Sequence, residues 1–374
     1  MRFIGLYAVV LAAAGCSDGG VDGSGAEPGA PAEEARAVLD ARTIDYPLAL
    51  RTASLKLLDA PPRLAQIKEI AGAPSPREAY EAAVDEMLAD VRFRRRMVRW
   101  WKDTMRLGGA ADADRPSRNT APVFVAQVVL EERPYSDIFT ATSGTCPDYD
   151  EAAGSFIPAD CNNGVPVHAG VLTNPGVQHQ FYGNMAFRRV RWLQEIFLCT
   201  PFPAERVPAG GGDYTSPWPL DSIASSPIDF RDTTAIVCGN CHTTMNHIAP
   251  LFGSFDASGA FQASGQVQTP VAPSPLTTET SHWLSGGEMT AWRYGEPAAD
   301  LPALGQAVAA DPAAAECAVA RAWNFAMSKE DIVSDRVTVP QEVIQPFIDE
   351  FQSNGRSLKK VLRAILVSED FVRF

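Results

Sequence analysis

The chain is expected to fold around the stretch Cys238-Gly239-Asn240-Cys241-His242. Two cysteines spaced C-x-x-C and followed directly by histidine are the attachment signature of c-type haem. One helical turn brings both thiols to the same edge of the porphyrin, where they form thioether bonds. We therefore expect one covalent haem c on Cys238 and Cys241, with His242 as the proximal iron ligand. The other helices are expected to form the walls of its pocket.

Other chemistries of a C-x-x-C pair fit the sequence less well. A thioredoxin-type dithiol needs a βαβ pattern nearby, and none is visible. A structural zinc site needs four ligands; His247 would complete a Cys-Cys-His-His set, but His242 and His247 are five residues apart at one expected helix start. A chance or structural pair is the third alternative. Haem is favoured because the N-terminus carries an export signal, and haem is attached to such motifs outside the cytoplasm.

Residues 1–16 have the pattern of a bacterial lipoprotein signal peptide. Met1-Arg2 gives a positive start, and the apolar run Phe3–Ala14 is too short to span a membrane. The ending Ala13-Ala14-Gly15-Cys16 resembles a lipobox, in which Cys16 becomes the lipidated N-terminus. The alternative is an ordinary secretory signal with a nearby cysteine. We expect an exported protein, lipid-anchored to a bacterial membrane in the periplasm or at the outer-membrane surface.

The remaining chain divides into four regions by composition. Residues 17–36 are small, acidic and rich in Gly and Pro, which predicts a disordered linker. We expect an N-terminal helical region over 37–135, a loop-rich region with the motif over 136–260, and a C-terminal helical region over 261–374. The predicted fold class is mainly α: an irregular multi-helix body with long loops and little or no sheet. The net charge is −13 without a basic stripe, which argues against nucleic acid as a partner.

Apolar residues recur at helical spacing in the regions flanking the motif. Pro76 opens a helix whose apolar stripe runs from Tyr80 to Val91 and continues to Met105. Further helices are predicted over 122–132 and 185–198. Gly355 follows the second C-terminal stripe, where a left-handed cap is expected. The C-terminal stripes are Ala318, Ala322, Phe325 and Ala326; Val343, Ile344, Phe347, Ile348 and Phe351; and Leu358, Val361, Leu362, Ile365 and Leu366.

Four of the seven cysteines remain after lipidation and haem attachment. An even remainder in an exported protein predicts disulfides, and three pairings are possible. We favour Cys146–Cys161 because a short local loop closes easily and contributes roughly 3 kcal/mol in the chain-entropy model. Cys199–Cys317 then follows by elimination. Buried thiols are the alternative.

The distal iron ligand determines what a haem could do here. Methionine or histidine gives an electron carrier, whereas an open position allows ligand binding or catalysis. Met289, in a Gly-flanked loop 47 residues after His242, is the favoured ligand. Met245 and His247 are too close in sequence to reach the far face easily. His282, Met327 and the absence of a protein ligand remain alternatives.

Several stretches resemble the Planctomycete cytochrome C families of unknown function. Residues 50–109 carry an L-R-x-A-x-L-x-L-x-x-x-P-P start and a W-x-D-x-x-R element at Trp101, Asp103 and Arg106. Residues 168–205 carry A-G-V-L-T and an element similar to R-G-x-W-x-x-x-x-L-C-x-P-P-P. Residues 238–259 resemble C-x-x-C-H-x-x-M-D-P-L-G-F-x-L-E-x-F-D-x-x-G, and 317–374 resemble the helical end module.

The resemblance implies a mono-haem, exported, mostly helical protein of unassigned role, and it implies no catalytic residues. The chain departs from the family pattern after Met245, where Asn246 and His247 replace Asp and Pro and Ala249 replaces Gly. The local geometry after the motif is the part that these departures affect.

The sequence favours an electron carrier over an enzyme. We expect an exported, lipid-anchored mono-haem protein that exchanges single electrons with a redox partner protein whose identity the sequence does not give. One alternative is a redox enzyme or ligand sensor with an open distal site. Another is a surface scaffold or binding module with a structural or vestigial haem motif. No Ser/His/Asp or paired-carboxylate constellation stands out.

Overall fold

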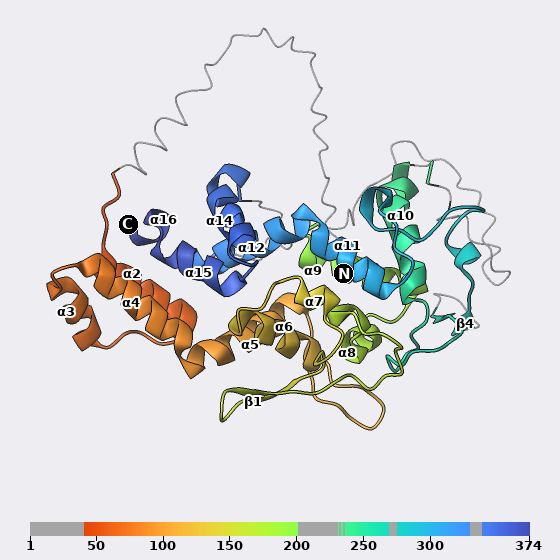
Figure 1. Cartoon of the computed structure of the whole chain (residues 1–374), viewed down its shortest axis with the longest axis horizontal. Helices are drawn as coiled ribbons and strands as arrows, with labels where there is room; N and C mark the ends of the chain where they lie inside the picture. The colour runs from red at the N-terminus through yellow and green to blue at the C-terminus, as the bar shows by residue number, and fades with distance from the viewer. Residues whose placement is uncertain (1–40, 201–230, 232, 235, 269–274, 330–338) are drawn as a thin grey trace, which may run out of the picture. The chain divides into compact units, whose positions relative to one another are not determined.

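The computed structural model describes residues 41–200, 231, 233–234, 236–268, 275–329 and 339–374. The predicted lipidation site Cys16 and the linker 17–36 lie outside the described residues. Residues Ile44–Phe374 form one compact unit, which is built mainly of helices (Figure 1). Within the described part of the chain, β-structure is confined to two two-stranded sheets and isolated bridges, so the prediction of a mainly α fold with little sheet is confirmed.

The N-terminal region is a series of helices, each ended by a residue outside helical geometry. They are α2 (Tyr46–Leu58), α3 (Leu64–Gly72), α4 (Pro76–Ala89), α5 (Val91–Met105) and α6 (Thr120–Leu130). The expectation of one apolar stripe through Val91 is wrong, because extended Asp90 separates α4 from α5. The Asp90 carboxylate caps α5 by accepting from the Arg92 N–H at 2.7 Å, and Val91 is 38% exposed.

The C-terminal region consists of α11 (Leu301–Ala310), α12 (Pro312–Ala326), α14 (Gln341–Ser353), α15 (Leu358–Val367) and α16 (Glu369–Val372). The three predicted apolar stripes are buried, except for Val343, which is 37% exposed at the start of α14. Gly355, just after α14, has φ 71° as its position predicted.

The described residues from the two ends of the unit meet in a common core. Helix α15 packs against α4 and α6, and the N–H of Asp45 donates to the carbonyl of Val372 at 3.0 Å. The buried Tyr80 hydroxyl donates to the carbonyl of Leu366 at 2.7 Å. This carbonyl belongs to the last turn of α15, where no intrahelical donor is available.

The middle of the chain consists of short elements around α9 and α10. They are α7 (Asp137–Thr140), β1 (Asp148–Asp150), β2 (Ser155–Ile157), η1 (Gly170–Thr173), α8 (Pro175–Gln180), η2 (Asn184–Ala186), α9 (Phe187–Phe197), α10 (Ile236–Ile248), η4 (Ala249–Phe252), β3 (Gln266–Val267), β4 (Leu276–Thr277), η5 (Thr280–His282) and η6 (Arg293–Gly295). Strands β1 and β2 are antiparallel with Tyr149 opposite Phe156, and β3 pairs with β4 in the same sense.

Two disulfides join these elements, and both have the predicted pairing. Cys146–Cys161 closes a loop over β1 and β2, and Cys199–Cys317 ties the second residue after the end of α9 to α12. The predicted apolar face of α9, from Phe187 to Phe197, is buried. The disulfide and this face together fix α9 against the C-terminal helices.

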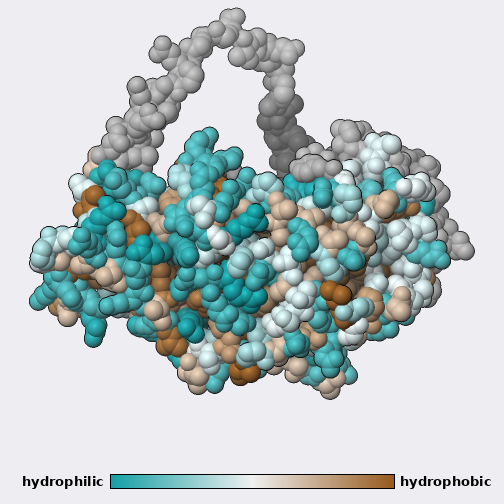
Figure 2. Space-filling view, viewed as in Figure 1, coloured by the Kyte–Doolittle hydropathy of each residue, from teal (hydrophilic) through white to brown (hydrophobic). Residues whose placement is uncertain are grey.

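Figure 2 shows a face that is mostly hydrophilic, with apolar residues scattered in small groups. No helix among the described residues is long and apolar enough to cross a bilayer.

Replacing Tyr80 by Phe tests the contact between α4 and α15. The change leaves the buried Leu366 carbonyl without its donor, so we expect a loss of about 1–2 kcal/mol in the free energy of unfolding, measured in urea.

Burial raises the pKa of Tyr80 above its ordinary value. The unfolded state therefore ionises first above pH 10, native stability falls there, and Tyr80→Phe should flatten that fall. Tyr46→Phe, whose hydroxyl has no hydrogen-bond partner within the described residues, is the control and should change little.

Candidate functional site

The C-x-x-C-H motif lies within α10, which is helical across Cys238–His242. The two cysteines are therefore about one turn apart, as the spacing predicts. The side chain of Cys238 is outside the described atoms. Cys241 is partly buried against the core and belongs to neither of the two disulfides. Haem attachment itself stays a prediction.

The His242 imidazole is held by its own helix and by α9. Its Nδ1 lies 2.9 Å from the Asn246 Oδ1, one turn later. The Phe187 ring meets it edge-on, with centroids 4.8 Å apart and an interplanar angle of 84°. Burial lowers the pKa of His242. The hydrogen bond to Asn246 raises this pKa, but by less than burial lowers it. The imidazole is therefore neutral at pH 7, and donation from Nδ1 places the lone pair on Nε2.

Met289 lies near the far end of α10 from the motif. Its carbonyl is 2.8 Å from the His247 Nδ1, and its side chain is 73% exposed. Five residues on a helix correspond to about 140° of rotation, so His247 and His242 face different directions. The distal assignment of Met289 stays a prediction.

The alternative ligands lie elsewhere. His282 is in η5, where its Nδ1 accepts from the Glu279 N–H at 3.2 Å, and burial lowers its pKa. Met327 follows the end of α12. Within the described residues, no three His, Cys, Asp or Glu side chains gather as a metal site.

A left-handed turn precedes α9 and sets the position of Phe187. Asn184, Met185 and Ala186 have φ of 47°, 54° and 63°. Left-handed geometry costs roughly 1–2 kcal/mol per non-glycine residue. The turn is held through Met185, whose N–H donates to the Gln268 carbonyl and whose carbonyl accepts from the Trp283 indole, both at 2.9 Å.

Arg189 is a fully buried cation that joins three elements. From α9 it donates to the carbonyls of Gln178 in α8 at 2.7 Å and Phe252 at the end of η4 at 2.6 Å. A longer contact of 3.4 Å reaches the Phe255 carbonyl. The guanidinium also lies over the Tyr182 ring, 5.2 Å from its centroid. The Gln178 and Phe252 carbonyls are at helix ends that lack intrahelical donors. Arg189 therefore fixes the segment after α10 onto α9.

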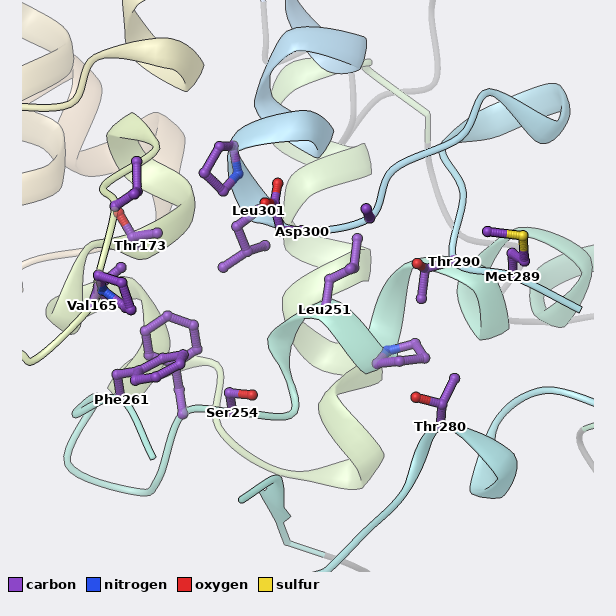
Figure 3. Close-up of a pocket in the computed structure, with 16 residues that line it drawn as sticks. Val165, Thr173, Leu251, Ser254, Phe261, Thr280, Met289, Thr290, Asp300 and Leu301 are labelled. Carbon is purple, nitrogen blue, oxygen red and sulfur yellow. The ribbon is translucent and has the colours of Figure 1, made fainter. Parts of the chain in front are cut away.

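A cleft of about 550 Å³ opens beyond the C-terminal end of α10 (Figure 3). Its walls come from the loop 165–167, Thr173 in η1, the segment 250–255, Phe261, Thr280, the loop 289–290 and the N-terminus of α11. None of the described motif residues lines it. The cleft lies past the C-terminal end of α10, whereas the motif lies in the N-terminal half of that helix.

Sequence reasoning missed three features of this region. Arg189 stands at the position of the arginine in the R-G-x-W element. That match was the one feature of the sequence that could have pointed to Arg189 as a structural contact. Asn246 stands one turn after His242, which was enough to suggest a hydrogen bond. The cleft carried no signal, because its walls come from segments that are far apart in the chain.

Comparison with known proteins gives one match. A family model described as PSCyt2, protein of unknown function (DUF1549), matches residues 32–153. This is a planctomycete cytochrome-C-associated domain family. No curated protein and no solved structure matches the chain. The matched segment covers α2 to α7 and β1 and ends before α10, so the match does not extend to the motif.

Replacing Arg189 by Met should destabilise the whole region. The Gln178 and Phe255 carbonyls lose their donor, whereas the Phe252 carbonyl keeps the Phe255 N–H at 3.4 Å. Each unsatisfied group costs about 1–3 kcal/mol, so we expect a loss of about 2 kcal/mol or more in the free energy of unfolding. The adjacent Arg188 is exposed, and Arg188→Met should cost less than about 1 kcal/mol. Urea unfolding followed by circular dichroism measures both. Equal losses for the two variants would show that the hydrogen bonds of Arg189 to the backbone carbonyls do not stabilise this region.

Proposed function

We propose that this chain is an exported, lipid-anchored, mono-haem c-type cytochrome-like protein that carries single electrons to and from a redox partner protein. The observation that carries the proposal is the C-x-x-C-H motif on helical backbone, with the His242 Nδ1 engaged by Asn246. An iron-ligating histidine typically donates its other ring nitrogen to an oxygen acceptor, which fixes the tautomer and the ring orientation. The match to a cytochrome-C-associated family supports the same conclusion.

Each residue of the site has a defined part in this proposal. The Cys238 and Cys241 thiols hold the haem covalently, and the His242 Nε2 ligates the iron. Asn246 orients the imidazole, and Phe187 limits its rotation. The bound haem supplies one reversible electron through the change between ferric and ferrous iron. Cys16 provides the membrane anchor, and Met289 is the proposed distal ligand.

The position of Met289 favours a second candidate, a redox enzyme or ligand sensor with an open distal site. Its side chain is 73% exposed, and its backbone lies beside His247. Stoichiometric carbon monoxide binding to the reduced, native protein distinguishes this candidate from the carrier, whose iron has two protein ligands.

Covalent haem is the first test. The full chain, produced in a host that matures c-type haem, should retain a peroxidase stain after denaturation and show reduced-minus-oxidised absorption bands. Cys238→Ser/Cys241→Ser should abolish the stain, because no thioether can form. Thr243→Ala changes an exposed neighbour on the same helix and should stain normally. A double variant that still stains, or a colourless wild type without iron, would contradict the proposal.

Substitutions at Asn246 should shift the reduction potential in opposite directions. Asn246→Asp offers a carboxylate to the His242 N–H, makes the imidazole more basic and stabilises ferric iron, so the potential should fall. Asn246→Ala removes the acceptor and should raise it. We expect shifts of tens of millivolts, since a tenfold change in relative stability is about 59 mV for one electron. Protein-film voltammetry measures them, and shifts of the same sign would exclude this role.

A further inference from the structure

The cleft beyond the C-terminal end of α10 has no part in haem attachment. We propose that it binds a neutral organic molecule of two fused rings with a carbonyl oxygen on either side, a compound of the quinone class. The proposal is argued from the cleft residues, which include Met289 but none of the residues that would attach haem covalently.

The size and walls of the cleft suit a small apolar ring system. Ligand sites typically measure about 300–1,000 Å³ and are lined mainly by hydrophobic and aromatic side chains, and this cleft has about 550 Å³. Figure 3 shows Leu251 and Leu301 among the apolar side chains around this space. The apolar side chains are Val165, Pro166, Val167, Pro250, Leu251, Phe255, Phe261, Met289, Ala299, Leu301 and Pro302.

Hydroxyl groups provide the polar contacts. Figure 3 shows Ser254 and Thr280 on opposite sides of the lower part of the cleft, with their hydroxyl oxygens directed toward the space between them. Neither hydroxyl has a hydrogen-bond partner within the described part of the chain. A hydroxyl donates one hydrogen bond, so two carbonyl acceptors on opposite edges of a flat ring match this pair. A plain hydrocarbon chain offers neither hydroxyl an acceptor.

The charge of the walls selects against anions. Among the described residues that line the cleft, none is basic and Asp300 alone is charged. Its carboxylate caps α11 by accepting from the Ala303 N–H at 2.8 Å, so it already compensates the positive end of that helix. The whole chain has a net charge of −13, which adds to the repulsion of an anionic ligand.

The probe for this site is 2,3-dimethyl-1,4-naphthoquinone, whose substituted ring carbons do not add thiols readily. Titration calorimetry with the full chain should show one binding site. Val167→Trp should reduce affinity at least tenfold, because Val167 lines the rim and is 51% exposed, so the larger ring occupies the cleft without disturbing the core. Val343→Trp places the same ring at a 37% exposed position on α14, outside the cleft, and should bind as wild type does.

Two further arms test the chemistry. Ser254→Ala and Thr280→Val should each weaken binding about threefold to tenfold by removing one neutral hydrogen bond. An analogue with a carboxymethyl group in place of one methyl should bind at least tenfold more weakly. The haem-free Cys238→Ser/Cys241→Ser protein should bind the neutral probe normally, so failure of the haem proposal does not affect this result. Absence of binding, unchanged affinity in Val167→Trp, or a preference for the anionic analogue would overturn the proposal.

Discussion

The buried guanidinium of Arg189 is the interaction on which the arrangement of the site depends. Within the described residues no carboxylate lies within 4 Å of it, so its charge is met by backbone carbonyls and aromatic faces. Burial lowers the pKa of Arg189 to about 9, and the group therefore stays charged at neutral pH. Because the carbonyls belong to α8 and to the segment after α10, one side chain of α9 holds together α8 and a segment that contributes a wall of the cleft.

This anchorage allows a strained turn to persist beside the motif. Three consecutive left-handed residues, Asn184–Ala186, are unfavourable locally, so they need support from neighbouring segments. Hydrogen bonds from the Trp283 indole and to the Gln268 carbonyl provide that support. The consequence is that α9 begins with the Phe187 ring against His242. Backbone strain and imidazole orientation are thus linked by a single residue.

The features predictable from the sequence were those encoded by local spacing. The apolar stripes of α9, α12 and α15, the helical motif and the Cys146–Cys161 pair each depend on residues that are close in the chain. The break between α4 and α5 at Asp90 was missed, because the apolar residues recur at helical spacing on both sides of it. The sequence did not show that the Asp90 carboxylate caps a new helix there. The burial of Arg189, the left-handed turn and the cleft could not be derived, because each depends on contacts between distant segments. Arginine is normally exposed, so only its carbonyl partners explain its burial.

The segment that matches the family model is physically joined to the motif through α9. Trp192 donates its indole N–H to the carbonyl of Met105 at 3.1 Å, and Arg106 pairs with the buried carboxylate of Glu195 at 2.8 Å. Arg106 belongs to the W-x-D-x-x-R element and Trp192 to the R-G-x-W element, so two motifs that are distant in sequence contact each other. The same α9 carries Phe187 and Arg189, which bear on α10 and the segment after it. A substitution at this interface would therefore shift α9 and, with it, the Phe187 ring that packs against His242, although the motif residues themselves are unchanged.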